Sequence, residues 1–401
     1  MNKIIENFGL FDFDLNGSGA TPSTRTVEIR GEDRTYLRQK QRPNFEHGNG
    51  EVRIVDLFCG AGGISLGLAE AARAFGRKAT ICLGVDIEPR ALAVFKNNFP
   101  QARLEEADLA AMFSSDLDSP EFGKQELALR KSVGHVDILV GGPPCQGHSD
   151  LNNFSRRSDP KNRLYLLMAR AAKVFQPTFV VIENVPGAKH DKGGAVASTM
   201  AALTREGYHV TYDVIDMREI GVPQSRKRLV MIAAKDKAHD IRTLLSAYRT
   251  EVRSVRWAID DIQDEAPGSL ATTPSTPSHD NKERINYLFD LDVSDLPDKL
   301  RPPCHRDKSH SYKSIYGRLR WDEPAQTITS GFYSMCMGRY VHPSRRRTLT
   351  AHEAARLQFF PDYFSFEAAE KRTALAQIIG NAVPPKLAFV FGHYLIGQLL
   401  K

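Results

Sequence analysis

Short apolar runs alternate with amphipathic stretches from residue 51 to about residue 235. Runs rich in Val, Ile and Leu without polar alternation are typical of strands that are buried on both faces of a sheet. The stretches between them place apolar residues three or four positions apart, as amphipathic helices do. This alternation predicts an α/β fold with a doubly wound, mostly parallel sheet. The predicted strands are residues 52–58, 80–86, 136–142, 178–184 and 228–234, and the clearest predicted helices are residues 64–76, 89–99 and 164–175.

The pattern changes on either side of this region, which suggests four segments. Residues 1–50 are rich in Gly, Asn, Ser and charge, so we expect a mostly flexible N-terminal extension with a short anchor at residues 3–13. Residues 51–236, which hold the alternating pattern, form the expected α/β domain. Residues 237–371 show few periods, which predicts a smaller, irregular domain, and residues 372–401 are expected to pack back on the first domain.

Composition places the chain among globular proteins. Its 401 residues are 41% hydrophobic and 25% charged, which fits neither a disordered nor a fibrous protein. No apolar run approaches the ~20 residues of a membrane span, and the N-terminus lacks the order of a signal peptide, so we expect a cytoplasmic protein. The five cysteines do not indicate a disulfide framework. Free thiols are therefore available for chemistry.

The positive charge of the chain is unevenly distributed. The net charge is +6, and residues 299–347 hold 11 Lys or Arg residues against 3 Asp or Glu residues. This segment includes the run Arg345, Arg346 and Arg347. Such a segment is either a solvated basic face or a surface that binds phosphates.

A glycine-rich turn, DLFCGAGG at residues 56–63, follows the first predicted strand and precedes a helix. Its glycines allow the backbone to approach a ligand at the helix N-terminus. Asp86 ends the next strand, where a carboxylate can accept hydrogen bonds from ribose hydroxyls, and Asp108 ends a third strand. These features indicate a nucleoside-bearing cofactor, either a nicotinamide dinucleotide or S-adenosylmethionine. We interpret Cys59, inside the turn, as a small space-filling residue.

A second cysteine, Cys145, stands behind two prolines in GGPPCQG at residues 141–147. The prolines hold the backbone extended and have no N–H donors, so they fix the direction of the thiol. With this block the chain resembles the DNA (cytosine-5)-methyltransferases, and the resemblance runs from about residue 53 to residue 390. The other matching blocks are the glycine-rich turn, ENV at 183–185, QSRKR at 224–228, RTLTAHEAARLQFFPD at 347–362 and GNAVPP at 380–385.

The resemblance implies a Rossmann-like, S-adenosylmethionine-dependent methyltransferase of the bacterial restriction–modification type. It implies that Cys145 is the nucleophile, that Glu183 holds and polarises the target base, and that Arg226 and Arg228 support the base and nearby phosphates. It makes residues 51–236 the catalytic and cofactor-binding domain and residues 237–371 the target-recognition domain. The implied contacts to S-adenosylmethionine are Phe58, Gly60, Gly62, Asp86, Ile87, Asp108, Pro143, Leu164 and Asn381. The expected DNA contacts are Arg156, Arg157, Lys161, Arg163 and Gln224.

The chemistry of cytosine agrees with these assignments. Carbon 5 becomes nucleophilic only after a thiolate adds at carbon 6, and sulfur both attacks and departs readily. Only ~3% of a free thiol is ionised at pH 7, so the site must stabilise the thiolate of Cys145. Glu183 in its carboxylic acid form would stabilise the negative charge at ring nitrogen 3. The base must leave the duplex, and we expect the basic loop at residues 149–163 to close on the DNA.

Several alternatives stay open at this point. Glu183 can be a buried acid paired with an arginine, and His148, where the family usually has phenylalanine, is interpreted as a tolerated substitution. A zinc site at Cys304, His305, His310 and Cys336 is disfavoured, because these residues lack a close Cys-x-x-Cys pair. The alternative hypotheses for the function are methylation of tRNA, DNA binding without catalysis, and oxidation or reduction with a flavin or nicotinamide cofactor. We expect a monomer that acts on double-stranded DNA, either as a solitary methylase or with a restriction endonuclease that cuts the same site without a stable complex.

Overall fold

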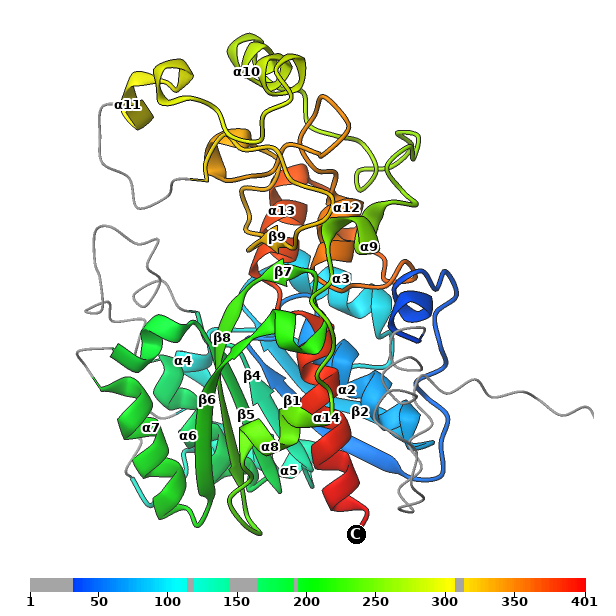
Figure 1. Ribbon diagram of the computed structural model, residues 1–401. Coiled ribbons are helices and arrows are strands. Elements are labelled where there is room, and N and C mark those ends of the chain that lie inside the picture. Colours follow the sequence, from blue (N-terminus) through cyan, green and yellow to red (C-terminus); the bar gives the residue numbers. More distant parts are fainter. Residues whose placement is uncertain (1–31, 114–118, 145–163, 191–193, 307–313) are drawn as a thin grey trace, which may run out of the picture.

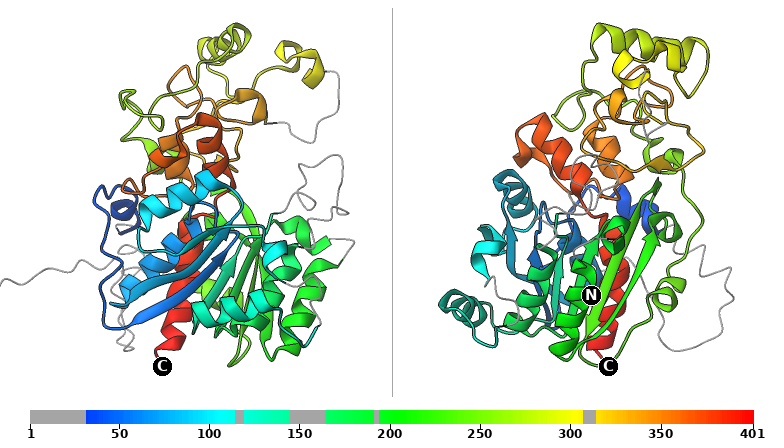
Figure 2. Two further views of the ribbon diagram at one scale, coloured as in Figure 1. Left: turned by 180° about the vertical axis from the view of Figure 1, so that it is seen from behind. Right: turned by 90° about the vertical axis from the view of Figure 1, so that its left-hand side faces the viewer.

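The computed structural model describes residues 32–113, 119–144, 164–190, 194–306 and 314–401 (Figure 1). A seven-stranded sheet with helices on both faces forms a lower lobe. A smaller upper lobe, residues 255–381, contains short helices joined by long irregular segments (Figures 1 and 2).

The sheet is mostly parallel, with the strand order β3-β2-β1-β4-β5-β8-β6. β8 runs antiparallel to β5 and to β6, and the other neighbouring pairs are parallel. The predicted α/β class and its five strands are confirmed. β3 is the third strand expected before Asp108, and the edge strand β6 is additional. The side chains of both are mostly half-buried, which explains why no continuous apolar run marks them. The strands are β1 (Glu51–Leu57), β2 (Lys78–Asp86), β3 (Leu104–Glu106), β4 (Ile138–Gly141), β5 (Phe179–Asn184), β6 (His209–Asp216) and β8 (Lys227–Ala234).

Alternate residues of each central strand enter two different cores. Ile54 of β1 lies opposite Ile138 of β4, and both belong to the core on one face of the sheet. Their neighbours Val55 and Leu139 belong to the core on the other face. Because side chains alternate across a strand, a strand covered on both faces must be apolar at every position.

Helices cover each face of the sheet. The first core receives side chains from α2 (Gly63–Ala74), α3 (Pro89–Asn98), α8 (Ile241–Ser246) and α14 (Pro385–Leu399). The second core receives side chains from α4 (Leu109–Met112), α5 (Lys124–Val133), α6 (Leu164–Phe175) and α7 (Ala195–Arg205). The predicted helices thus appear as α2, α3 and α6.

α14 packs along α2 at unusually close range. A methyl group at Gly67 would overlap the carbonyl oxygen of Pro385 and would lie 2.6 Å from the backbone nitrogen of Phe389. The apolar character of α14 therefore comes from its burial against α2. Among the described residues no single helix is long and apolar enough to cross a membrane. α13 (Arg372–Asn381) and α14 pass that test only together, and they are bent by 41°.

The upper lobe is not an independent unit. It has a small core of its own around Ile285, Leu288 and Tyr316, but Ile328 and Leu349 belong to the large core of the lower lobe. The expected boundaries therefore shift: α8, placed in the smaller domain by sequence, packs in the lower lobe, and α13 lies in the upper lobe (Figure 1). The regular elements here are α9 (Val255–Ile259), α10 (His279–Asp290), α11 (Pro303–Arg306), β9 (Ala325–Gln326) and α12 (Ala351–Leu357). The 3-10 helices among the described residues are Pro186–His190, Met217–Ile220, Asp298–Leu300, Met335–Met337 and Glu367–Ala369.

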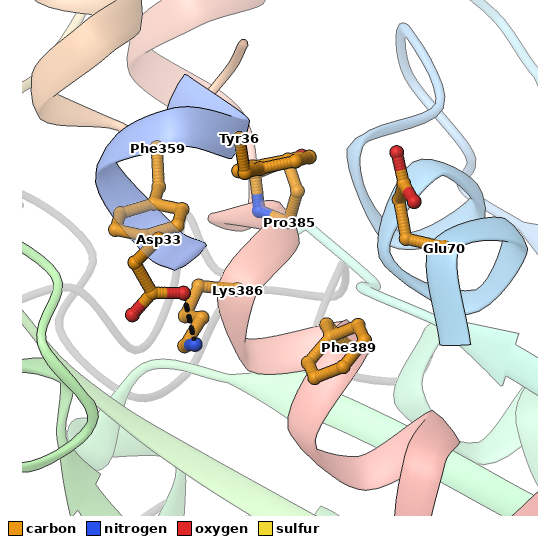
Figure 3. Close-up of a pocket in the computed structure, with 7 residues that line it drawn as sticks. All are labelled: Asp33, Tyr36, Glu70, Phe359, Pro385, Lys386 and Phe389. Carbon is orange, nitrogen blue, oxygen red and sulfur yellow. Dashed lines mark hydrogen bonds and ion pairs between the residues drawn. The ribbon is translucent and has the colours of Figure 1, made fainter. Parts of the chain in front are cut away.

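Residues 32–50 are part of the core, so the expectation of a mostly flexible extension is wrong for this stretch. Tyr36, Leu37 and Phe45 are buried in the large core. Asp33, which is 1% exposed, pairs with Lys386 of α14 and with Arg253, each at 2.6 Å. Figure 3 shows the small cavity beside this ion pair, lined by Asp33, Tyr36, Glu70, Phe359, Pro385, Lys386 and Phe389. The anchor expected at residues 3–13 lies outside the described residues.

The contact between α2 and α14 predicts that Gly67→Ala lowers the free energy of unfolding. The added methyl group meets backbone atoms that cannot rotate away, and such overpacking costs about 1–3 kcal/mol. Denaturant unfolding measures the change. Gly268→Ala is the matched control, since a methyl group there meets only one atom, at 4.0 Å. Equal stability of the two variants would contradict the close packing.

Candidate active site

The candidate site residues gather at one edge of the sheet. Strands β1, β2, β4 and β5 are parallel neighbours, so their carboxyl ends lie side by side. The glycine-rich turn follows β1, Asp86 ends β2, and Gly142 with its two prolines follows β4. Glu183 lies at the end of β5. Ligands of open α/β sheets bind at this edge.

The turn after β1 has a backbone that only a few residue types adopt readily. Phe58, Gly60 and Gly62 have φ angles of 57°, 51° and 86°. The N–H of Gly60 donates to Oδ2 of Asp86 at 2.8 Å, so the turn is tied to the end of β2. A methyl group at Gly60 would have no atom within 4 Å, whereas one at Gly62 would press on the ring of Phe95. The turn is therefore open on the side of Gly60.

The residues after β2 and β3 suit a nucleoside. Ile87, which follows Asp86 in the chain, is 71% exposed, so its apolar side chain is free to contact a ligand. Asp108 is exposed and accepts a hydrogen bond from the N–H of Ala110 at 2.9 Å, which caps α4. An apolar surface next to two carboxylates matches an aromatic base joined to a ribose. The described residues thus fit the predicted cofactor.

The remaining predicted cofactor residues flank this opening. Pro143 is buried after β4, and Leu164 is half-buried at the start of α6. Asn381 is exposed at the end of α13, two residues before Val383. The side chain of Val383 would lie 3.8 Å from a methyl group at Gly142, which brings GNAVPP beside the proline block. The segment GNAVPP and the residues that follow β4 are therefore neighbours.

Cys59 is poorly suited to be a nucleophile. Its side chain is 6% exposed, and burial raises the pKa of its thiol well above the usual value. The carboxylates of Asp56 and Asp86 raise the pKa of this thiol further. Cys59 therefore stays protonated, in agreement with the space-filling role expected from the sequence. Cys145 lies outside the described residues, as do His148 and the four basic candidates at 156, 157, 161 and 163.

Glu183 and Arg228 form an ion pair at the ends of β5 and β8. Nε of Arg228 lies 2.5 Å from Oε1 of Glu183, and the side chains are 13% and 11% exposed. The other carboxylate oxygen would lie 3.2 Å from a methyl group at Gly142, so Glu183 faces the proline block. Opposite charges at this distance form a strong, charge-assisted contact. This contact matches the alternative interpretation of Glu183 as a buried acid paired with an arginine. The arginine, Arg228, is the last residue of QSRKR.

Tyr165 is a residue of this region that no sequence motif marks. It lies on α6 and is 1% exposed, and its hydroxyl has no hydrogen-bond partner in the described structure. Burial raises the pKa of this hydroxyl, and the negative charge of Glu183 raises it further. Tyr165 therefore lies within electrostatic reach of Glu183. An apolar environment on α6 gives no signal in the sequence, because LYLLMARAAKVF resembles any buried helix.

Gln224 and Arg226 are placed differently from the prediction. Gln224 is 0% exposed, so it cannot contact DNA in this arrangement, and that assignment is corrected. Arg226 is 2% exposed and donates to the carbonyl oxygens of Ile328 and Ala382 at 3.0 and 3.1 Å. The two arginines do not face a common target, because Arg228 turns toward Glu183. A role for Arg226 at the base stays a prediction.

The basic segment at residues 299–347 is largely neutralised by carboxylates. Several of its arginines pair with acids that lie earlier in the chain, so a count within the segment misses them. The partners are Arg318 with Asp292 at 2.5 Å, Arg339 with Asp295 at 2.6 Å, Arg346 with Asp290 at 2.6 Å, and Arg345 with Asp264. Arg345 and Arg346 are the exposed members of this group, and exposed pairs contribute little to stability, so phosphates can replace their carboxylates.

Asp56, the first residue of DLFCGAGG, is a buried carboxylate behind the turn. It is 0% exposed, and its Oδ2 accepts a hydrogen bond from the Ser65 hydroxyl at 2.7 Å. Burial raises the pKa of Asp56 to about 7, opposed in part by the hydrogen bond from Ser65 and reinforced by the charge of Asp86. Asp56 is thus protonated in a large fraction of molecules near neutral pH.

Comparisons with known proteins agree with this geometry. A family model described as C-5 cytosine-specific DNA methylase matches residues 52–396. Type II methyltransferase M1.BsuMI of Bacillus subtilis is 40% identical, covering 96% of this chain and 94% of that protein. Type II methyltransferase M1.HphI of Haemophilus parahaemolyticus is 33% identical and covers 84% of each. The crystal structure of the S. pombe Dnmt2 methyltransferase has a TM-score of 0.60 at 17% identity, covering 87% of this chain and 99% of that one, which shows a shared fold.

Asp56→Asn tests the buried carboxylate. The pKa of Asp56 is about 7 in the folded protein and ~3.9 in the unfolded chain. Asp56 therefore ionises first in the unfolded chain, and the free energy of unfolding falls as pH rises from about 4 to 7. Asparagine does not titrate. The free energy of unfolding of the variant relative to the wild type should therefore rise by on the order of 3 kcal/mol between pH 5 and pH 8. Denaturant unfolding at both pH values measures it, and an unchanged difference would refute the pKa.

Proposed function

Because the chain belongs to the C-5 cytosine-specific DNA methylase family, we propose that it methylates carbon 5 of a cytosine within a specific sequence of double-stranded DNA. The observation that carries this proposal is the meeting of Glu183, Arg228 and Gly142 beside the cofactor opening. Burying two charges costs free energy unless they pair with each other or bind a ligand. Glu183 and Arg228 pair with each other, and they border the block that carries Cys145. The resemblance to Type II methyltransferases supports a restriction–modification role.

S-adenosylmethionine would supply an electrophilic methyl group on a sulfonium. The turn at Phe58, Gly60 and Gly62 would let the backbone approach it. Asp86 and Asp108 would accept hydrogen bonds from its hydroxyl and amino groups, while Ile87 would cover the adenine face. Pro143, Leu164 and Asn381 would close the remaining sides.

Cys145 is the proposed nucleophile. The target base would first leave the duplex, because its ring atoms cannot be reached inside the stack. The thiolate then forms a bond to carbon 6, and the electron pair moves to carbon 5, which becomes nucleophilic. After carbon 5 is methylated, its proton departs, the electron pair re-forms the ring double bond, and the bond between sulfur and carbon 6 breaks. The thiolate is thereby regenerated.

Glu183 and Arg228 act on the base as a pair. Addition at carbon 6 places negative charge on the ring, and a guanidinium beside the ring stabilises that charge. Glu183 holds the guanidinium in place and presents its second oxygen toward the proline block, where the exocyclic amino group of cytosine can donate to it. The pair is already assembled, so no charge has to be moved during the reaction.

The upper lobe supplies the proposed DNA surface. Phosphates would displace Asp264 and Asp290 from Arg345 and Arg346, which are 41% and 48% exposed. Arg156, Arg157, Lys161 and Arg163 would contact DNA from the other side. The protein would act as a monomer, with a restriction endonuclease as a partner in function but not in a stable complex.

Cys145→Ala should abolish methyl transfer, because alanine cannot add to carbon 6. Cys59→Ala is the matched control and should keep at least a third of the wild-type rate, since its thiol is buried and protonated. Transfer of a radioactive methyl group to duplex DNA and, in parallel, to tRNA measures the rates. Unimpaired transfer by Cys145→Ala would refute the nucleophile, and preference for tRNA would refute the substrate.

Glu183→Gln should lower the rate of transfer about 10²-fold or more, as expected for loss of a group that acts on the reacting base. Glu70→Gln is the matched control, because Glu70 is also buried and pairs with Arg73 at 2.8 Å, but on α2. Single-turnover rates with saturating DNA and cofactor separate chemistry from binding. Equal losses in the two variants would show that Glu183 contributes only to stability.

A further inference from the structure

A joint formed by two short strands is one of the contacts between the sheet and the upper lobe. β7 (Gln224–Ser225) pairs in parallel with β9, with Gln224 opposite Ala325. Figure 1 shows these two strands between the lobes, at the upper end of β8. The chain leaves β7 and enters β8 within two residues, so a shift at the joint reaches β8 directly.

The side-chain amide of Gln224 uses both of its N–H donors inside this joint and accepts one hydrogen bond. Its Nε2 donates to the carbonyl oxygen of Leu357 at 2.8 Å and to Oε1 of Gln358 at 2.7 Å. Its Oε1 accepts from the N–H of Ile328 at 3.1 Å. Gln224 therefore holds two segments of the upper lobe at once.

Gln358, which is also 0% exposed, continues the network. It accepts from Gln224, and its Nε2 donates to the carbonyl oxygen of Ile379 at 2.6 Å. The guanidinium of Arg226 reaches the same region, donating to Ile328 and Ala382. Three buried polar side chains thus bind residue 328 and residues 379–382 to the start of β8.

Residues 379–383 lie against the candidate site on their other side. A methyl group at Gly380 would overlap the backbone nitrogen of Ser330, so the two backbones are in contact. The carbonyl oxygen of Val383 would lie 2.7 Å from a methyl group at Gly63, and its side chain approaches Gly142. This segment therefore touches the recognition region, the cofactor turn and the proline block.

We propose that Gln224 and Gln358 are positioning residues that fix the recognition region relative to Glu183. The segment that reads the DNA sequence and the residues that act on the base are thereby held at one relative position. The inference rests on the proposed function. Arg228 follows Arg226 by two residues on the same chain segment and pairs with Glu183, so the joint and the acidic residue are connected through β8. A protein that only needed a stable joint could fill it with apolar side chains, because buried polar networks are costly unless every group is satisfied.

Gln224→Glu tests the hydrogen-bond pattern through pH. The introduced carboxyl would face two acceptors, the Leu357 carbonyl and Oε1 of Gln358, which suit its protonated form and repel its ionised form. Burial favours the protonated form at low pH. The rate of the variant relative to the wild type should therefore be at least tenfold higher at pH 6 than at pH 8.5. A flat ratio would overturn the positioning role of this amide.

Gln358→Met provides a second test that adds no charge. The variant should lower kcat at least tenfold, change the Kd for S-adenosylmethionine less than twofold, and raise at least tenfold the share of methylated cytosines outside the wild-type target sequence. Bisulfite sequencing of genomic DNA methylated in vitro measures that share. Asn98→Leu is the matched control, because the buried Asn98 amide also holds backbone groups, at Val94 and Ser365, away from the joint.

The outcomes distinguish failure of the positioning role from failure of the proposed function. Loss of target selectivity in Gln358→Met but not in Asn98→Leu supports the positioning role. Wild-type selectivity in Gln358→Met, or an equal loss in both variants, overturns it. Absence of methylation by the wild-type protein on any DNA overturns the proposed function, and the inference falls with it.

Discussion

At the ends of β5 and β8, the Arg228 guanidinium and the Glu183 carboxylate meet at 2.5 Å in a place that water hardly reaches. Removing one partner would leave an uncompensated buried charge, so the two strand ends and the residues around them must stay in register. The antiparallel β8 makes this possible, because it brings the start of one strand to the end of another. Gly142, inside the proline block, leaves room for the carboxylate, and Pro143 and Pro144 follow it directly. The geometry of the candidate site thus depends on this pair.

Much of the fold can be predicted from the sequence, because strands buried on both faces need apolar residues at every position. Leu229 to Ala234 shows that pattern clearly, and Val52 to Phe58 shows it with two interruptions, at Arg53 and Asp56. The pattern carries no direction, so it cannot show that β8 runs antiparallel. It also fails at β6, whose residues are mostly half-buried at the sheet edge. Residues 32–50 were predicted wrongly, because Tyr36 and Phe45 are isolated apolar residues whose burial depends on distant partners such as Tyr363.

The candidate site also contains residues whose placement the sequence predicts and residues whose placement it does not. Residues at strand ends, such as Asp86 and Glu183, follow from strand positions and from the family resemblance. Gln224 could not be placed from its spacing, because its burial depends on partners more than a hundred residues away, at Ile328 and Gln358. The ion pairs of Arg339 and Arg346 could not be predicted from the basic segment alone, because their carboxylate partners precede it in the chain. Local patterns predict which face of a strand a residue occupies, but not the segment that folds over it.

The central claim is that the sulfur of Cys145 bonds to carbon 6 of a cytosine taken out of the duplex. Duplex DNA that contains 5-fluorocytosine tests it directly, because fluorine cannot leave carbon 5 as a proton does, so the bond to sulfur persists. After incubation with S-adenosylmethionine and digestion, mass spectrometry identifies the peptide that carries the nucleotide. The account predicts a methylated 5-fluorocytosine adduct on the peptide that contains Cys145. An adduct on another residue, or none from a protein that methylates ordinary DNA, would contradict it.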